Sequence, residues 1–250
     1  MEKIRIKLIS IGHMPFDFNK NKILKFRSSA FTIVGDIDSY ALRCNADGPE
    51  WEFSDYLVRS QLPKISEADL AIAIVSVPLQ YKWYTRVIET NRIAFSYNDI
   101  KKILDESNIP LENALLRVIN AYALAYKKLD GKIKVDTDIK EFAHDETRGC
   151  IFDMNGLLSD IVASCHSPII CDDCQERLRS NRVSNGLIMG VQKDIRKIRK
   201  GLYYVAFDFL RKHPIWSLAI SSIFASSLGI SSSIAASYLY DYLKIAFQNN

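Results

Sequence analysis

Four of the five cysteines lie close together in the sequence, at Cys150, Cys165, Cys171 and Cys174. Cys171-Asp-Asp-Cys174 is a C-x-x-C motif, whose turn directs two thiolates at one metal ion. A closed tetrahedral site needs a second pair of ligands, and the segment that runs from His144 to Cys150 offers one imidazole and one thiol. The sequence therefore predicts a structural zinc ion held by His144, Cys150, Cys171 and Cys174.

Other interpretations of this cluster stay open. Cys165 and His166 are competing zinc donors in a predicted loop. A redox C-x-x-C of the thioredoxin type opens a helix after a strand, and here Asp172 and Asp173 would raise the thiol pKa values. Free buried thiols are the third interpretation. Disulfides are not expected, because the body of the chain is predicted to face the cytoplasm.

The sequence contains no intact catalytic motif. It has four histidines, and it lacks H-E-x-x-H, G-x-S-x-G and a P-loop. Three groups of side chains near predicted strand ends could take part in catalysis, but each has a more typical interpretation. We interpret His13 as a residue of a solvated loop and Asp36 with Asp38 as part of a solvated sheet edge. Trp83, Tyr84 and Arg86 are interpreted as packing a hairpin. Glu112 and Asn113 are interpreted as helix caps. We therefore assign no catalytic residue.

The elements that must position the cluster follow from hydrophobic periodicity. The run 69–77 is nearly continuously apolar, which is typical of a strand buried on both faces. The segment 110–129 is predicted to form a long helix, which carries one apolar face and ends before Gly131. The fold class predicted is α+β, a mixed sheet with a long central helix and a zinc-stapled C-terminal region, within a body of residues 1–180. Strands are expected at 3–11, 31–37, 69–77 and 92–97, helices at 97–105 and 110–129, the zinc knuckle at 144–178 and a linker at 177–186.

Residues 69–178 resemble the C-terminal half of the archaemetzincins, a family of zinc metalloproteases. A strand and a long helix precede His144, Cys150 and Met154, and C-x-x-C and Leu178 follow. The resemblance implies a second, cysteine-rich zinc knuckle beyond the catalytic helix, with Cys150, Cys171 and Cys174 as ligands. It does not extend to the protease site, because the helix over 110–129 contains no histidine. The resemblance therefore implies a relative without proteolytic activity.

Residues 183–213 show apolar side chains at helical spacing opposite lysines and arginines, which predicts a basic amphipathic helix next to a membrane. Binding to anionic headgroups and packing on a protein core both fit this pattern. The net charge of +4 is small against 33 basic and 29 acidic residues. Nucleic acid is therefore not an expected partner.

Residues 214–243 are predicted to form a transmembrane helix. The stretch from Pro214 to Tyr240 has no charged residue, and a helix of that length exceeds a hydrocarbon core of about 30 Å. Basic residues before it place the N-terminal body in the cytoplasm by the positive-inside rule, as in a single-pass tail anchor. A buried serine-rich helix of a soluble domain and a re-entrant hairpin broken at Gly229 are the alternatives.

Small residues recur every fourth position along this helix and form one face on which a second helix can pack closely. That face consists of Ser217, Ser221, Ala225, Gly229, Ser233 and Ser237.

The function predicted from these parts is a membrane-anchored binding or effector module. Its cytoplasmic domain senses a ligand or protein partner, and its C-terminal helix oligomerises in the lipid bilayer. The architecture resembles that of the membrane-acting effectors of bacterial defence systems. The alternative is a membrane-tethered, divergent metalloprotease-like hydrolase, for which Cys165 with His166 or His13 would be the nucleophile and base candidates.

Overall fold

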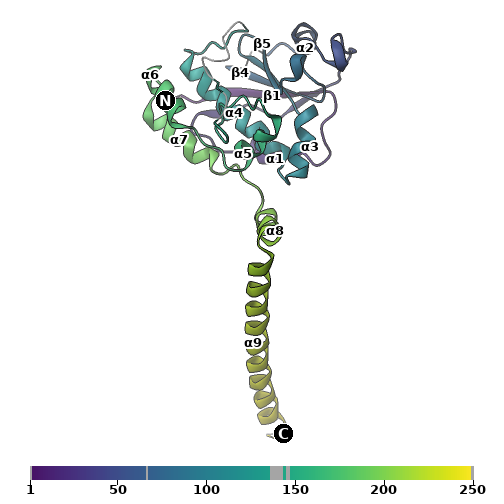
Figure 1. Ribbon diagram of the computed structural model, residues 1–250, viewed down its shortest axis with the longest axis vertical. Coiled ribbons are helices and arrows are strands. Elements are labelled where there is room, and N and C mark those ends of the chain that lie inside the picture. The colour runs from purple at the N-terminus through teal and green to yellow at the C-terminus, as the bar shows by residue number, and fades with distance from the viewer. Residues whose placement is uncertain (1, 66, 136–142, 145–146, 249–250) are drawn as a thin grey trace. The chain divides into compact units, whose positions relative to one another are not determined.

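The computed structural model describes residues 2–65, 67–135, 143–144 and 147–248, and over 239–248 it describes the backbone alone. The chain divides into two compact units, Met1–Lys200 and Gly201–Asn250 (Figure 1). The first unit is a mixed α/β body built around one sheet. The second consists of two helices.

The sheet has six strands in the order β2-β1-β4-β6-β5, and β3 also pairs with β1. β2 and β3 pair with the first and second halves of β1, and β4 lies on its other side. All pairs are parallel except β5 with β6. The strands are β1 (Ile4–Ile11), β2 (Phe31–Ile33), β3 (Asp38–Tyr40), β4 (Leu70–Val75), β5 (Thr85–Glu89) and β6 (Arg92–Ser96).

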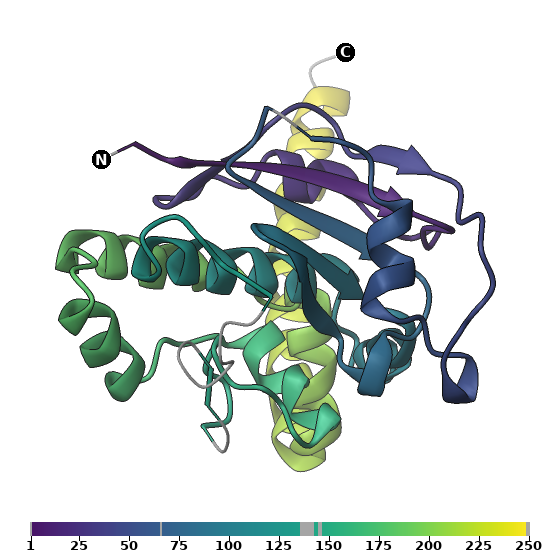
Figure 2. The same ribbon diagram turned by 90° about the horizontal axis from the view of Figure 1, so that it is seen from above.

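Both faces of the sheet are covered. Along β1, Ile4, Ile6 and Leu8 belong to one apolar cluster, and Ile9 and Ile11 belong to another, as the two-residue period of a strand requires. Helices pack mainly on the first side, where α4 (Leu111–Lys128) and α7 (Asn185–Ile195) lie along the sheet (Figure 2). The shorter helices of the body are α1 (Lys20–Leu24), α2 (Asp55–Gln61), α3 (Asn98–Glu106) and α5 (Ile161–His166), with 3-10 turns at Pro49–Trp51, Gln80–Lys82 and Leu158–Asp160.

The predicted long helix is α4 (Leu111–Lys128), and it runs through the middle of the body. Nearly all of its first four turns are buried, so its neighbours enclose it on every side. Gly131 follows its end with a φ of +83°, and its N–H donates to the carbonyl of Tyr126. A residue with a side chain would be strained in this backbone conformation. The predicted stop at Gly131 is therefore confirmed.

The strands at β1, β4 and β6 and the helices α3 and α4 lie where the sequence predicts them. The strand expected over 31–37 is shorter, because Gly35 turns the chain with a φ of +66°. The antiparallel edge strand β5 and the short strand β3 were not predicted, since neither carries a long apolar run.

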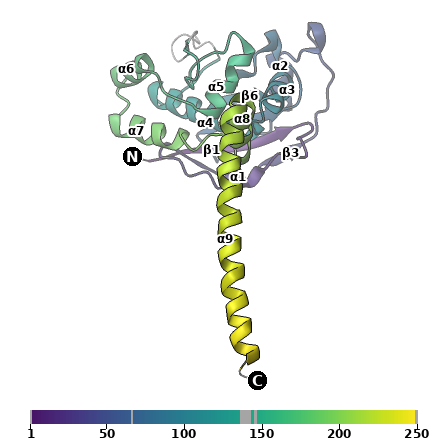
Figure 3. The same ribbon diagram turned by 60° about the horizontal axis from the view of Figure 1, so that its bottom comes forward.

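The linker predicted at 177–186 is wrong. Helix α6 (Asp172–Ser180) and helix α7 (Asn185–Ile195) are joined by four residues and contact each other, and Val183 between them is buried (Figure 3). Helix α7 also contacts α4. The compact body therefore extends to Lys200 and does not end at residue 180.

The single amphipathic helix expected over 183–213 is two helices, α7 and α8 (Leu202–Lys212). The helix stops at Ile195, and Gly201, with an extended backbone, begins the next one. The apolar face of α7 is buried in the body, where the Asp194 carboxylate accepts the backbone N–H of Ser29 at 2.6 Å. Core packing is therefore the correct interpretation for α7. In the second unit, α8 is followed by α9 (Pro214–Gln248).

The docking of α7 predicts opposite effects at its two glycines. A Cβ at Gly190 would lie 2.8 Å from the Ser29 side chain, whereas a Cβ at Gly186 would have nothing within 4 Å. We expect Gly190→Ala to lower the free energy of unfolding by about 1–3 kcal/mol through overpacking. Gly186→Ala, the matched control, should raise it by about 0.5–1 kcal/mol because alanine favours a helix. Thermal and urea unfolding measure both, and equal effects would mean that α7 does not pack on Ser29.

Candidate metal centre

Two of the four predicted ligands lie in a compact turn held by main-chain hydrogen bonds. His144 forms a parallel bridge with Asp153, because its N–H donates to the carbonyl of Phe152. Cys150 forms a second bridge with Ile169. These bonds fix both side chains on one small scaffold, whose turn at Gly149 has a φ of +94°.

The other two ligands open helix α6. Cys171 is the N-cap residue, with an extended backbone, and Cys174 lies in the first helical turn. The three-residue spacing therefore brings both sulfurs to the same end of the helix. Cys174 is buried and Cys171 is partly exposed.

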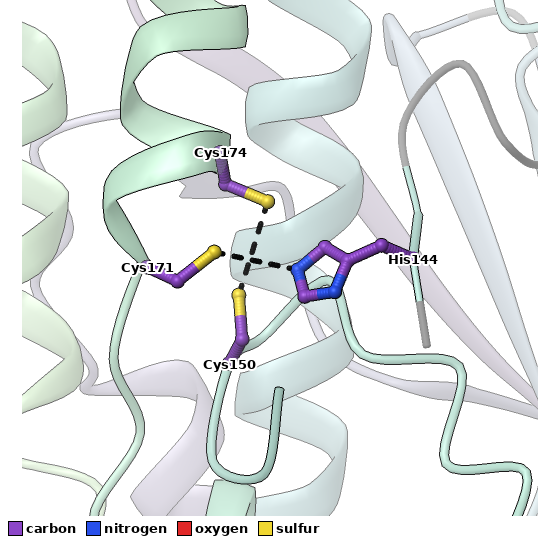
Figure 4. A group of neighbouring side chains, drawn as sticks. All are labelled: His144, Cys150, Cys171 and Cys174. Atoms are coloured by element: carbon purple, nitrogen blue, oxygen red, sulfur yellow. Dashed lines mark hydrogen bonds between the residues drawn. The ribbon is translucent and has the colours of Figure 1, made fainter. Parts of the chain in front are cut away.

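The four side chains converge on one point (Figure 4). Their ligand atoms all lie within 4.8 Å of one another. The Sγ atoms of Cys150 and Cys174 are 3.9 Å apart, and Cys171 Sγ is 3.4 Å from His144 Nε2. A tetrahedral zinc ion with Zn–S bonds of about 2.3 Å and a Zn–N bond of about 2.0 Å has ligand atoms about 3.5–3.8 Å apart. The spacing therefore fits a single zinc ion without rearrangement of the scaffold.

The electrostatics of the thiols favour a cation at this point. A hydrogen bond from the Cys174 thiol lowers the pKa of Cys150 to about 5. The same shared proton raises the pKa of Cys174, and burial raises the pKa of Cys171, with the Cys150 thiolate adding to it. Three thiolates at these distances repel one another unless a positive ion lies between them. A divalent ion would reverse the upward shifts and release the protons.

The donor set supports zinc as the cofactor of this chain, since three sulfurs and one imidazole nitrogen are typical of closed zinc sites.

The competing donors, Cys165 and His166, lie outside this cluster. Cys165 is fully buried in the apolar core, where burial raises its pKa to about 12. His166 Nδ1 accepts the backbone N–H of Lys200. The C-x-x-C does open a helix, as a redox motif would, but Cys150 and His144 complete a metal-binding set around it.

The remaining candidates do not gather in one cleft. His13 is exposed after β1. Asp36 and Asp38 are exposed and pair with separate lysines, Lys20 and Lys7.

The residues around Trp83 divide between two roles. Arg86 forms a bidentate ion pair with Asp55 of α2, with both bonds at 2.5 Å, so it packs the edge of the sheet. Trp83 and Tyr84 line a pocket beside α4. Arg117 also lines this pocket, and its burial could not be predicted from the sequence, because one arginine in an apolar helix is indistinguishable from a surface residue.

Glu112 and Asn113 connect α4 to its neighbours and do not cap it. The Glu112 carboxylate accepts the backbone N–H of Asn19, and the Asn113 amide donates to the carbonyl of Cys165. The N-cap residue is Pro110. Both polar side chains are buried, so their partners compensate the loss of water.

No protein-family model and no curated protein matches this sequence. The structure is similar to the crystal structure of archaemetzincin from Methanopyrus kandleri, with 14% identity and a TM-score of 0.43. The match covers 72% of this chain and 96% of that chain. A likeness at this distance assigns no residue role, so the site is argued from its own geometry.

The metal centre predicts one zinc ion per chain. Full-length protein purified in detergent should contain one equivalent of zinc by elemental analysis. Cys171→Ser should reduce zinc affinity at least tenfold and lower the unfolding temperature, because structural zinc contributes directly to folding. Cys44→Ser is the control, since Cys44 packs against the other apolar cluster. Zinc-free wild-type protein, or equal zinc content in Cys171→Ser and Cys44→Ser, would rule out this site.

Proposed function

We propose that this protein is a membrane-anchored, zinc-stapled binding module. The cytoplasmic body senses a small-molecule or protein ligand, and the C-terminal helix inserts in the bilayer and self-associates there. The observation that carries the proposal is the composition of α9. Its segment from Pro214 to Tyr238 is 25 residues long and is apolar enough, by length and composition, to cross a membrane.

Exposure of large apolar side chains along the whole segment supports a lipid environment. Trp216, Leu218 and Ile223 are each at least two-thirds exposed. A soluble protein would bury such a surface, since exposed apolar patches of this extent mark interaction or membrane sites. The serines do not oppose insertion, because their hydroxyls donate to helix carbonyls one turn earlier, as Ser221 does to Ser217 at 2.6 Å.

Helix α8 supports an interfacial position before the span. Its side chains are mostly exposed and include Leu202, Tyr203 and Phe207, and its last turn carries Arg211 and Lys212. An amphipathic helix of this kind lies at the boundary between headgroups and acyl chains. Within this second unit, α8 and α9 border an apolar groove that includes Ser217 and Ser221. The small-residue face available to a second copy therefore begins at Ala225.

A structural role for the zinc accords with the rest of the body. All four ligand positions are filled by protein side chains, which leaves no position for water or substrate. The hydrolase alternative depends on a reactive Cys165, but burial keeps this thiol protonated. A buried neutral thiol is a poor nucleophile.

Membrane insertion predicts resistance to alkaline carbonate extraction. Full-length protein should stay in the membrane pellet. Ile223→Arg combined with Ile230→Arg should move it to the supernatant or to inclusion bodies, because each charge near the bilayer centre costs about 2.5–3.5 kcal/mol. The double variant with leucine at both positions is the matched control and should remain in the pellet. Extraction of the wild-type protein would contradict anchoring.

Self-association predicts a dependence on the small-residue face. A Cβ at Gly229 would meet nothing within 4 Å in a single chain, so a larger residue fits the monomer. Ala225→Ile with Gly229→Ile should therefore abolish cross-linked oligomers in detergent by blocking close helix approach. Phe224→Ile with Leu228→Ile changes the face about 100° further around the helix and should leave them intact. Oligomers that persist in the first variant would refute packing through this face.

A further inference from the structure

Two 3-10 turns meet beyond the carboxyl end of β4. The turn Pro49–Trp51 precedes α2, and the turn Gln80–Lys82 follows β4. The two segments are joined by the backbone of Phe53, whose N–H donates to the carbonyl of Pro78 and whose carbonyl accepts the N–H of Gln80. In open sheets of parallel strands, ligands bind outside the carboxyl ends of the strands. The two turns therefore lie at the edge of the sheet where binding sites are typical.

An acidic pocket lies between the two turns. It measures about 490 Å³, which is within the range of small-molecule sites. Its lining includes the carboxylates of Asp47, Glu50 and Glu52, and Lys82 is the one lysine or arginine among the described lining residues. Three negative charges and one positive charge give this lining a formal charge of −2. The pocket therefore attracts cations.

Glu52 is a buried carboxylate that forms no ion pair with any residue the structure describes. It is 6% exposed, and its Oε2 accepts the backbone N–H of Tyr81 at 3.0 Å. The Lys82 ammonium contacts Glu50 instead. This ion pair raises the pKa of Lys82, and Glu52 and Asp99 add to the shift, so several carboxylates share one cation. A buried carboxylate without a counterion of its own is costly, and a bound cation would compensate it.

Asp47 supplies a second anionic group, which is held in place. Its Oδ2 accepts the Ser54 hydroxyl at 2.5 Å, and its Oδ1 accepts the Ser54 N–H at 2.8 Å. These two hydrogen bonds lower the pKa of Asp47, so the group is ionised at neutral pH. Each carboxylate oxygen can accept a further hydrogen bond from a ligand.

A single metal ion does not match this set of carboxylates. In the part of the chain that the structure describes, the one group of side chains close enough together to hold a metal ion is the cysteine and histidine cluster. The three carboxylates of the pocket therefore do not converge on one point, as the coordination of calcium or magnesium requires. An elongated cation with its charges at separate points fits the lining better.

We propose that this pocket binds an aliphatic diamine, whose two ammonium groups are joined by a short methylene chain. One ammonium pairs with Glu52 at the buried side of the pocket, and the other pairs with Asp47 at its exposed side. The methylene chain lies against Pro49 and the Tyr81 ring. Primary alkylamines such as the lysine side chain have a pKa of about 10.4, so both groups are charged at neutral pH. Their two charges match the formal charge of the lining.

The inference names the ligand class of the body and therefore rests on the proposed function. Its failure is distinguishable from failure of the anchor, because ligand binding is read inside the body and anchoring is read by extraction.

The test is isothermal titration calorimetry of the full-length protein in nanodiscs of phosphatidylcholine, a lipid without net charge, with empty nanodiscs as the blank. 1,4-Diaminobutane should bind saturably at one site per chain. 1-Butylamine, which has one ammonium group, should bind at least tenfold more weakly. Magnesium ion, which concentrates two charges at one point, should also bind at least tenfold more weakly. Spermidine contains the same diamine unit, so tighter binding would identify a polyamine as the source of the two ammonium groups, and weaker binding would identify a simple diamine.

Two pairs of variants assign the binding to the pocket. Glu52→Gln keeps an acceptor for the Tyr81 N–H and should weaken 1,4-diaminobutane binding at least tenfold. Glu106→Gln removes the same charge from an exposed position on α3 and should stay within threefold of wild type.

The second pair keeps the binding test independent of any effect of Glu52→Gln on folding. Gln80 also lines the pocket. Gln80→Lys supplies an internal ammonium and should weaken binding at least tenfold, whereas Gln80→Met, of similar length and without charge, should stay within threefold of wild type. Absence of saturable binding, equal affinity for the diamine and for 1-butylamine or magnesium, or equal effects of Gln80→Lys and Gln80→Met would overturn the proposal.

Discussion

The C-terminal half of the body depends on the mutual repulsion of three thiolates and its relief by a cation. Cys150 comes from a turn and Cys171 and Cys174 from the start of α6, and Cys150 and Cys174 belong to the same apolar cluster. Without an ion, the site holds its sulfurs together by sharing protons, as the opposite pKa shifts of Cys150 and Cys174 show. A zinc ion bound by these residues would displace those protons and would hold the turn and the start of α6 together.

The segment that holds Cys150 also contributes to the pocket beside α4. The turn that carries Cys150 continues directly into Phe152, Asp153 and Met154, which form one wall of the pocket. The carbonyl of Asp153 accepts a hydrogen bond from Arg117, so the same turn orients the buried cation. Cys150 is therefore two to four residues away from these wall residues.

Much of the fold can be predicted from hydrophobic patterns. What an amphipathic helix packs against cannot be predicted in this way. The runs of β4 and α4 specify their elements, because an uninterrupted apolar strand and a helix with a broad apolar face require burial. The face of α7 has the same pattern as a membrane-surface helix, and only the tertiary structure shows that it packs on the body near Ser29. The metal cluster was predictable from residue type and spacing, since few other arrangements of Cys and His satisfy four ligands. The pocket beside α4 was not predictable, because Arg117 is held there by hydrogen bonds to Tyr84 and Asp153, which are distant in sequence.

The coordination of zinc in the purified protein tests the account most directly. X-ray absorption at the zinc edge counts the ligands and measures their distances in the full-length chain. The account predicts three sulfur atoms at about 2.3 Å and one imidazole nitrogen at about 2.0–2.1 Å. A shell with two or fewer sulfurs, or with a water oxygen in place of a protein ligand, would contradict it.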